Sequence, residues 1–153
     1  MPDYLEFTTG KFMFRVATDR WYAREGVWVS PRSQGEGSGV KVQIGLSDFL
    51  QQRSGDVAFA EAKPIGTTLA VGEEVASIET IKVDVALSLP ISGKVIEVNP
   101  ALETAPEAIN QDPYGAGWLA VIEAADWDTD RARLLEAAAY LEVIKRAAAE
   151  DMP

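Results

Sequence analysis

The sequence predicts a mainly β fold, a small sandwich or flattened barrel with short helices and an amphipathic C-terminal helix. Two observations carry this prediction. Short β-forming segments alternate with turns across residues 56–98, whereas residues 126–150 are rich in Ala, Glu, Leu and Arg. The chain has 153 residues, 47% of them hydrophobic and 25% charged, and these values suit a single compact core.

The chain is expected to form one domain in three consecutive parts. Residues 1–20 are predicted to be an N-terminal arm packed on the body, with Phe7 and Phe14 in its apolar cluster. Residues 21–125 are predicted to form the β-sandwich, and residues 126–153 a C-terminal helix of the same domain. No low-complexity segment or long linker divides these parts.

A hairpin is expected directly after the arm. The β-formers at 21–22 and 27–29 precede a turn-rich stretch at 33–39 and the apolar alternation of residues 40–44. A short helix over 48–53 follows, and two residues define its ends. Ser47 can cap its N-terminus, and Gly55 can end it by adopting the left-handed conformation.

A second hairpin follows. Residues 73–79 and 83–87 are predicted strands joined by Thr80-Ile81-Lys82, so Lys82 is expected at or beside the hairpin tip. The later elements are a strand at 94–98, a short helical turn between 99 and 107, a turn at 112–115 and a final strand at 117–122.

The last segment is predicted to be one amphipathic helix over residues 126–150. Leu134, Leu141 and Ile144 recur near helical spacing, so this helix is expected to lie on the β body. The candidates for its N-cap are Asp126, Asp128 and Thr129.

Charge and composition exclude several functions. Fourteen basic and 24 acidic residues give a net charge of -10, which opposes binding to nucleic acid or to an anionic membrane. An acidic surface suits weak, salt-sensitive docking to basic patches on partner enzymes. The chain has no histidine and no cysteine, so thiol nucleophiles, Cys/His metal sites and imidazole catalysis are excluded. Redox or group-transfer chemistry would therefore need a borrowed cofactor.

No segment predicts a membrane protein. The first six residues lack a positive flank followed by an apolar run, and no stretch approaches the roughly 20 apolar residues that span a bilayer. We therefore expect a cytoplasmic location.

Other candidate sites have simpler explanations. The glycines of residues 35–39 lie between two strands, with no following helix to bind a phosphate. The acidic residues at 73–74 and 126–130 lack calcium-loop spacing and are interpreted as solvated charge and helix capping. Trp28, Tyr114 and Trp118 could contact a cofactor but are assigned to the core, and Asn110 and Asp112 to turns.

Lys82 has two interpretations. It is either an exposed turn lysine that keeps the hairpin soluble, or an amine displayed for a modifying enzyme. A lysine at a rigid hairpin suits a swinging-arm anchor, because the scaffold fixes its backbone while the long side chain moves freely.

The residues around Lys82 resemble a known family. Residues 78–83, Ile-Glu-Thr-Ile-Lys-Val, are similar to the Glu-Ser-Val-Lys-Ala signature around the lipoylated lysine of glycine cleavage H proteins. The Met-Lys-Met signature of biotin carriers is absent. Blocks at 44–49, 55–57, 90–95, 98–102 and 106–119 also resemble that family in order and spacing, so the likeness covers about residues 21–145.

The resemblance implies a lipoyl/biotinyl-type β-sandwich with lipoate amide-linked to Lys82. Glu79 matches the family's acidic residue before the lysine and implies a role in lipoylation recognition, an exposed cross-strand charge being the alternative. The protein is then a carrier and no enzyme, whose arm moves an intermediate or electrons between partner enzymes. A lipoate-protein ligase or lipoyl transferase would attach the group.

Three departures from the family pattern bear on which pathway the carrier serves. The family's Tyr and His-Glu-Trp motif is reduced to Tyr22 and Gly26-Val27-Trp28, an arm precedes Trp21, and Val83 replaces Ala. These changes resemble lipoate-binding proteins of the heterodisulfide-reductase-like system of sulfur oxidation, and this role is preferred.

Two alternatives stay open. The first is an orthodox H protein that carries the aminomethyl group between glycine decarboxylase, aminomethyltransferase and dihydrolipoyl dehydrogenase. The second is an unlipoylated scaffold module in which Lys82 is a surface lysine.

Overall fold

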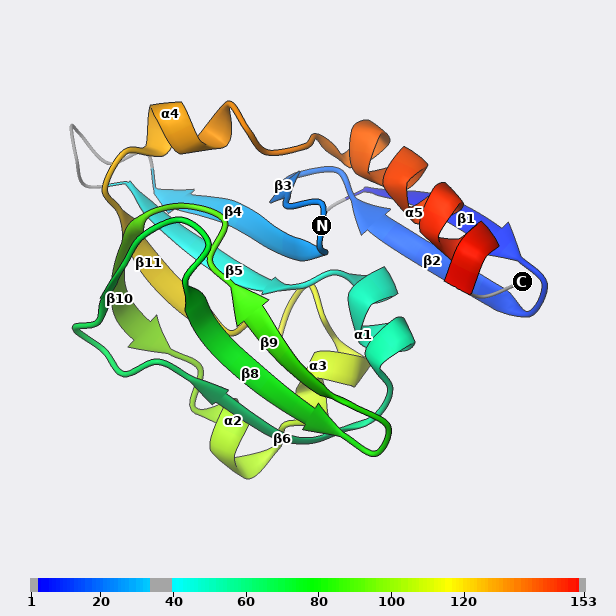
Figure 1. Cartoon of the computed structure of the whole chain (residues 1–153), viewed down its shortest axis with the longest axis horizontal. Coiled ribbons are helices and arrows are strands. Elements are labelled where there is room, and N and C mark those ends of the chain that lie inside the picture. The colour runs from blue at the N-terminus through cyan, green and yellow to red at the C-terminus, as the bar shows by residue number, and fades with distance from the viewer. Residues whose placement is uncertain (1–2, 34–39, 152–153) are drawn as a thin grey trace.

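A computed structural model describes residues 3–33 and 40–151. Its strands form three antiparallel sheets (Figure 1). The first is a hairpin of β1 (Tyr4–Thr9) and β2 (Phe12–Ala17). The second has six strands in the order β3 (Trp21–Tyr22), β4 (Val27–Ser33), β5 (Lys41–Leu46), β11 (Ala120–Ala124), β10 (Gly93–Val98) and β7 (Thr68–Leu69). The third has three strands in the order β6 (Val57–Ala62), β8 (Glu74–Thr80) and β9 (Asp84–Ser88).

The helices are short except for the last one. They are α1 (Asp48–Ser54), α2 (Ala101–Thr104), α3 (Ala108–Gln111), α4 (Trp127–Arg131) and α5 (Ala137–Asp151). None of the helices in the described ranges is long and apolar enough to cross a membrane.

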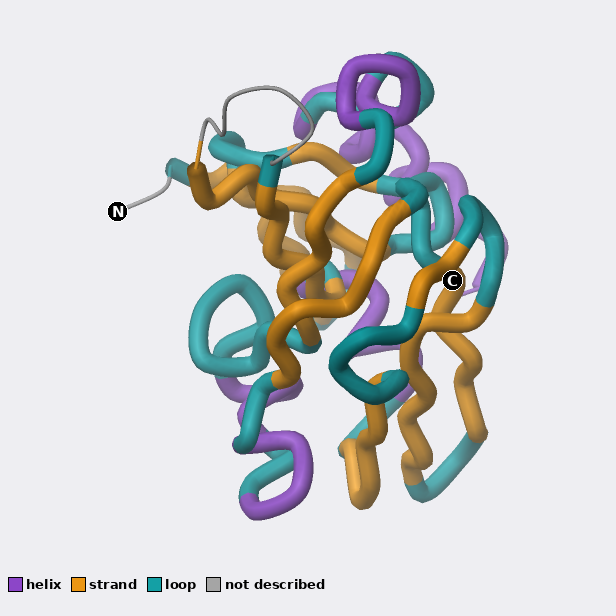
Figure 2. The backbone as a smooth tube through the Cα atoms, turned by 90° about the vertical axis from the view of Figure 1, so that its left-hand side faces the viewer, coloured by secondary structure: helices purple, strands orange, loops and turns teal. Residues whose placement is uncertain are grey.

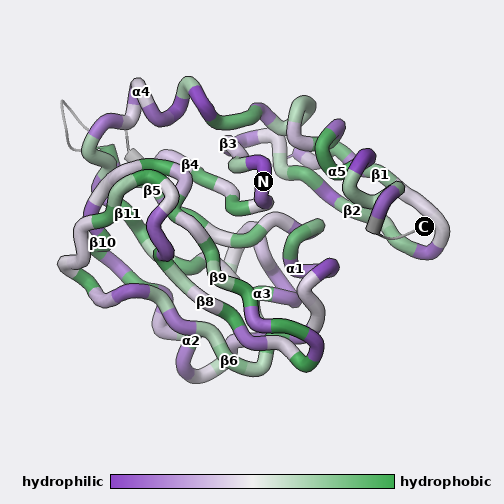
Figure 3. The backbone as a smooth tube through the Cα atoms, viewed as in Figure 1, coloured by the Kyte–Doolittle hydropathy of each residue, from purple (hydrophilic) through white to green (hydrophobic). Residues whose placement is uncertain are grey.

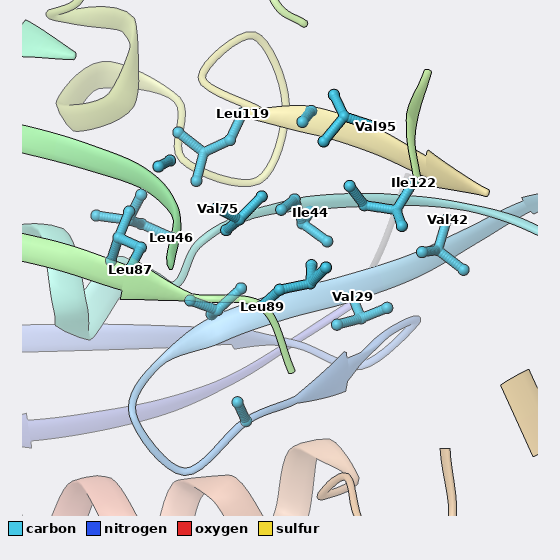
Figure 4. Close-up of a cluster of buried hydrophobic side chains, with 14 of the residues drawn as sticks. Val29, Val42, Ile44, Leu46, Val75, Leu87, Leu89, Val95, Leu119 and Ile122 are labelled. Carbon is cyan, nitrogen blue, oxygen red and sulfur yellow. The ribbon is translucent and has the colours of Figure 1, made fainter. Parts of the chain in front are cut away.

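The six-stranded and three-stranded sheets form two layers of a sandwich (Figure 2). Hydrophobic residues recur along strands of both layers, whereas α4 carries many hydrophilic ones (Figure 3). The predicted sandwich is confirmed, and the described strands of the two sheets do not join into a closed barrel. Its core contains Val29, Val42, Ile44, Leu46, Val75, Leu87, Leu89, Val95, Leu119 and Ile122 (Figure 4).

The predicted strands are largely present, with shifted boundaries: β8 and β9 each lie one residue later than predicted. The pairs β3–β4 and β4–β5 form as expected, although the turn predicted at 33–39 lies mostly outside the described residues. The final strand, β11, begins at Ala120 rather than at Gly117. The reason is that Gly117 closes a turn against α3, where an added Cβ would lie 2.5 Å from the carbonyl oxygen of Ala108.

Residues 4–17 form a hairpin that builds a second apolar cluster. β1 and β2 lie beside α5, and β2 also contacts α1 (Figure 1). The cluster is distinct from the sandwich core and draws on the hairpin, β3, β4, α1 and α5. Its buried members are Phe14, Val16, Tyr22, Trp28, Phe49, Ala137, Tyr140, Ile144 and Ala148.

The single C-terminal helix predicted over 126–150 is wrong. Two helices occur instead, because Leu135 exchanges two backbone hydrogen bonds of 2.8 Å with Tyr22 and cannot continue a helix. Among the proposed caps, Asp126 accepts a hydrogen bond from the Thr129 N–H and caps α4. Both helices pack on the molecule: α5 lies against β1, β2 and β3, and α4 packs on the sandwich through Trp127 and through Asp130, which accepts hydrogen bonds from Ser92.

Candidate functional site

Lys82 lies in the turn between β8 and β9, as the sequence predicted. Thr80 holds this turn closed. Its N–H donates to the carbonyl of Val83 (2.8 Å), and its hydroxyl accepts from the N–H groups of Lys82 (3.2 Å) and Val83 (3.0 Å). The hydroxyl also lies 3.0 Å from the Val83 carbonyl, to which it donates. A threonine hydroxyl used in this way fixes a tight turn, and the root of Lys82 is fixed with it.

The Lys82 side chain is exposed and lies back against the end of α1. Its Nζ donates a hydrogen bond of 3.2 Å to the carbonyl of Arg53. An ammonium group at a helix C-terminus is favourable because the last carbonyls are otherwise unpaired. Among the described residues no carboxylate pairs with Lys82. The amine is therefore held in one place yet remains accessible.

Gly55 makes room for this arrangement. Ser47 caps α1 as predicted, since its side chain accepts from the Leu50 N–H. Gly55 ends the helix with φ +97° and ψ -171°, which is not the predicted left-handed helical conformation but an extended one that only glycine adopts readily. A Cβ at Gly55 would also lie 3.1 Å from Lys82 Cε. The lack of a side chain at Gly55 therefore permits both this backbone conformation and the position of the Lys82 side chain.

Asn110 holds the Gly55 segment in position, a role that the turn prediction missed. Its Oδ1 accepts from the Val57 N–H (2.8 Å), and its Nδ2 donates to the Gly55 carbonyl (2.9 Å) and to Gln51 Oε1 (3.0 Å). Asn110 lies in α3, so these bonds join α1, α3 and the start of β6 beside the lysine. The sequence offers one signal for this role: Asn110 lies within residues 106–119, the longest block that resembles the family.

We expect Asn110→Ala to destabilise the fold by about 2–3 kcal/mol, because three polar groups lose their shared partner in a half-buried site. Urea denaturation followed by tryptophan fluorescence measures the change. The matched control is Gln111→Ala at the exposed neighbouring position, where a loss within about 0.5 kcal/mol is expected. Equal losses in the two variants would contradict the assigned role.

Glu79 lies on β8, three residues before the lysine. It is exposed and is paired in register with Asp84 on β9. Across the described residues neither carboxylate has an ion pair or a side-chain hydrogen bond. Like charges directly opposite each other on adjacent strands are destabilising. Glu79 therefore does occupy an exposed cross-strand position, but the residue that faces it, Asp84, is another acid rather than a base.

The aromatic residues considered as cofactor contacts belong to the second cluster. Trp28 is fully buried, while Tyr114 and Trp118 pack against that cluster. Burial raises the pKa of Tyr114 to about 12, so its phenol stays protonated and donates to the Arg15 carbonyl (2.7 Å). The same oxygen accepts from the Asp48 N–H (3.2 Å), and this side chain therefore ties the N-terminal hairpin to α1.

The comparison with known families agrees with this geometry. A family model described as "Glycine cleavage H-protein" matches residues 20–147. The chain belongs to the glycine cleavage H-protein family. Proteins of this family are carriers rather than catalysts and hold lipoate covalently on a lysine, so the chain is a lipoyl carrier.

Individual H proteins are similar over most of their length. A glycine cleavage system H protein of Coprothermobacter proteolyticus is 43% identical over 105 residues, 69% of this chain and 79% of that protein. One from Thermus thermophilus is 36% identical over 130 residues, 85% of this chain and 96% of that protein. The crystal structure of an H protein from Mycobacterium marinum superposes with a TM-score of 0.73 at 30% identity, covering 83% and 97% of the two chains.

These comparisons bear on the pathway. The relatives named above are H proteins of the glycine cleavage system, and the preference for sulfur oxidation finds no support among them. The hairpin of β1 and β2 precedes the matched region, which begins at residue 20. The N-terminal arm, one reason for preferring sulfur oxidation, therefore lies outside the region that the family model matches.

Proposed function

We propose that this protein is the H protein of a glycine cleavage system and that lipoate is attached to Lys82. The observation that carries the attachment site is the placement of Lys82: a lysine in the family-like block, fixed at a hairpin turn, with an accessible amine that no described carboxylate pairs. The pathway assignment is supported by the names of the H-protein relatives.

Each residue of the site has a distinct task in this proposal. Lys82 provides the nitrogen of the amide, and Thr80 holds its backbone in the turn. The Arg53 carbonyl accepts an N–H from Nζ, and Gly55 leaves space for the lysine stem. Glu79 provides an exposed charge for the lipoylating enzyme. When bound, lipoate supplies the two sulfur atoms that this cysteine-free chain lacks.

The proposed partners are a lipoate-protein ligase or lipoyl transferase, glycine decarboxylase, aminomethyltransferase and dihydrolipoyl dehydrogenase, acting together in the cytoplasm. Glycine decarboxylase must meet the arm at the Lys82 end of the molecule. The N-terminal hairpin packs against α5 and α1 and leaves the Lys82 amine exposed.

Reconstitution tests the pathway. The lipoylated protein, mixed with glycine decarboxylase and pyridoxal phosphate, should support exchange of labelled bicarbonate into glycine at a rate that rises with carrier concentration. Unlipoylated protein is the control and should give background exchange. A protein that is lipoylated at Lys82 yet inactive here, but is reduced and oxidised by a heterodisulfide-reductase-like complex, would contradict the glycine pathway while leaving the carrier role intact.

A further inference from the structure

The N-terminal hairpin has two strand edges, and side chains close the edge of β2. Alternate backbone groups of a strand in an antiparallel pair point away from its partner. On β2, the Arg15 N–H donates to Asp48 Oδ2 (2.9 Å), and the Arg15 carbonyl accepts from the Tyr114 hydroxyl (2.7 Å). The Met13 carbonyl accepts from Gln52 Nε2 (2.9 Å). The outward groups of β2 are therefore satisfied inside the molecule.

The edge of β1 is open by contrast. The Thr18 N–H donates to the Asp3 carbonyl (2.9 Å), so the odd-numbered residues of β1 bond to β2 and the even-numbered ones point outward. The outward residues are Tyr4, Glu6 and Thr8. Among residues 3–33 and 40–151, no group hydrogen-bonds to the backbone N–H or carbonyl of these three. An uncovered strand edge of this kind is a template for a further strand.

The apolar side chains of β1 are incompletely covered. Leu5 and Phe7 pack against the second cluster but stay partly exposed, as does Leu141 on α5. Their register partners on β2, Val16 and Phe14, are fully buried. Burial therefore falls from β2 to β1, and a strand added beside β1 would cover apolar surface that the single chain leaves in water.

Charge indicates which strand fits this edge. Residues 1–20 contain three acidic residues (Asp3, Glu6, Asp19) and three basic ones (Lys11, Arg15, Arg20), whereas the whole chain carries a net charge of -10. Arg15 also pairs with Glu6, the charged residue of β1 (3.2 Å). A basic strand of another protein finds no acidic edge here. A second copy meets no net repulsion from the hairpin, and salt screens charges beyond about 8 Å.

We propose that β1 pairs with β1 of a second copy of this chain, antiparallel about a two-fold axis, and joins the two hairpins into one four-stranded sheet. The axis passes through Phe7, which places Phe7 opposite its equivalent and Glu6 opposite Thr8. An axis through Glu6 would set two carboxylates directly opposite each other, which is destabilising. An axis through Leu5 would set the charged Asp3 opposite Phe7.

The position of α5 fits this sheet. The two-fold axis places α5 of both copies on the same face, where each helix covers two strands. Two strands are about 10 Å wide, and packed helices lie about 8–10 Å apart. In the single chain α5 already contacts both β1 and β2 (Figure 1). The dimer thus completes a two-layer unit of one sheet and two helices.

The contact leaves the carrier site accessible. The turn between β8 and β9 lies on the opposite side of α1 from β1 (Figure 1). Lys82 of each copy therefore stays exposed, and one particle presents two such lysines. The dimer itself does not depend on lipoate attachment.

Sedimentation velocity of the full chain over a wide range of concentrations tests the contact. The wild type should sediment as a dimer that dissociates on dilution. Thr8→Pro removes an outward N–H that the hairpin does not use, so the monomer should keep its fold while the dissociation constant rises at least about a hundredfold. Thr8→Ala, the control, retains the N–H and should change the dissociation constant by less than about threefold.

A cysteine cross-link tests the register. The chain has no cysteine, so an introduced thiol is the single one present. On either side of the axis, opposed residues without direct hydrogen bonds have Cα atoms about 4.5 Å apart, which a disulfide can span. Phe7→Cys should therefore form a covalent dimer of doubled mass under mild oxidation. Met13→Cys is the control, since Met13 is 40% exposed on β2 and lies away from the axis.

Several outcomes would overturn the proposal. They are a wild type that stays monomeric at every concentration, a dimer that Thr8→Pro leaves intact, and a dimer that Thr8→Ala dissociates equally. Cross-linking of Phe7→Cys no faster than that of Met13→Cys would refute the axis at Phe7. Circular dichroism of each variant verifies the fold. The carrier function is decided separately by the mass of the Lys82 peptide, so failure of one leaves the other standing.

Discussion

Lys82→Arg is expected to abolish lipoylation and carrier activity while leaving the fold intact. A guanidinium stays protonated at any pH that the protein survives and cannot act as the nucleophile that an amide bond requires. The change keeps the positive charge and a donor to the Arg53 carbonyl, so thermal unfolding should be unchanged. Intact mass after co-expression with a lipoate-protein ligase provides the measurement, with peptide mapping of the wild type to Lys82.

Lys94→Arg is the matched control, since Lys94 is exposed on β10 in the six-stranded sheet. It should gain one lipoyl group as the wild type does. A lipoyl group found on Lys82→Arg, or mapped to any other lysine of the wild type, would show that the attachment site has been assigned wrongly.

Trp28→Ala is expected to lower the free energy of unfolding by about 3–5 kcal/mol, a large part of the stability of a domain of this size. Trp28 is fully buried, and its indole N–H donates to the Pro113 carbonyl (3.0 Å). The Arg20 guanidinium lies 4.5 Å from the ring centroid. Gly45 faces the ring so closely that an added Cβ would lie 2.5 Å from it. Truncation therefore leaves a cavity and an unpaired carbonyl together.

Denaturant unfolding measures this loss, and Trp127→Ala is the control. Trp127 is only half-buried and lies on the short helix α4, so the same truncation should cost clearly less there. Similar losses in the two variants would mean that Trp28 does not hold the second cluster together.

Local sequence patterns predicted the elements that depend on nearby residues. The β8–β9 hairpin and the Ser47 cap follow from alternation, turn residues and capping chemistry within a few positions. The break between α4 and α5 did not follow, because it depends on pairing between Leu135 and Tyr22 at opposite ends of the chain. A helical periodicity shows which residues share a face but not which backbone groups a distant strand uses.

The candidate site likewise has parts that local sequence patterns predicted and parts that they did not. Lys82 and Glu79 could be proposed as site residues from the sequence because they lie in one short motif. The contributions of Asn110 and of the Arg53 carbonyl depend on contacts between separate elements, and a backbone carbonyl leaves no trace in a sequence. The sulfur-oxidation preference came from departures from the family pattern: the altered motif at residues 22–28, the added N-terminal arm and Val83. Such departures change what a family site can do, but they do not identify a new partner.

With lipoate attached at Lys82 as proposed, the hydrogen bond from Lys82 to the Arg53 carbonyl affects the length of the swinging arm. An acylated Nζ still carries one N–H, which is enough to keep the bond to the carbonyl at the end of α1. The pivot then lies at the amide rather than at the Cα of Lys82. A shorter tether searches a smaller volume and gives its free end a higher local concentration near α1, but reaches less far. Partner enzymes must therefore approach this end of the carrier closely.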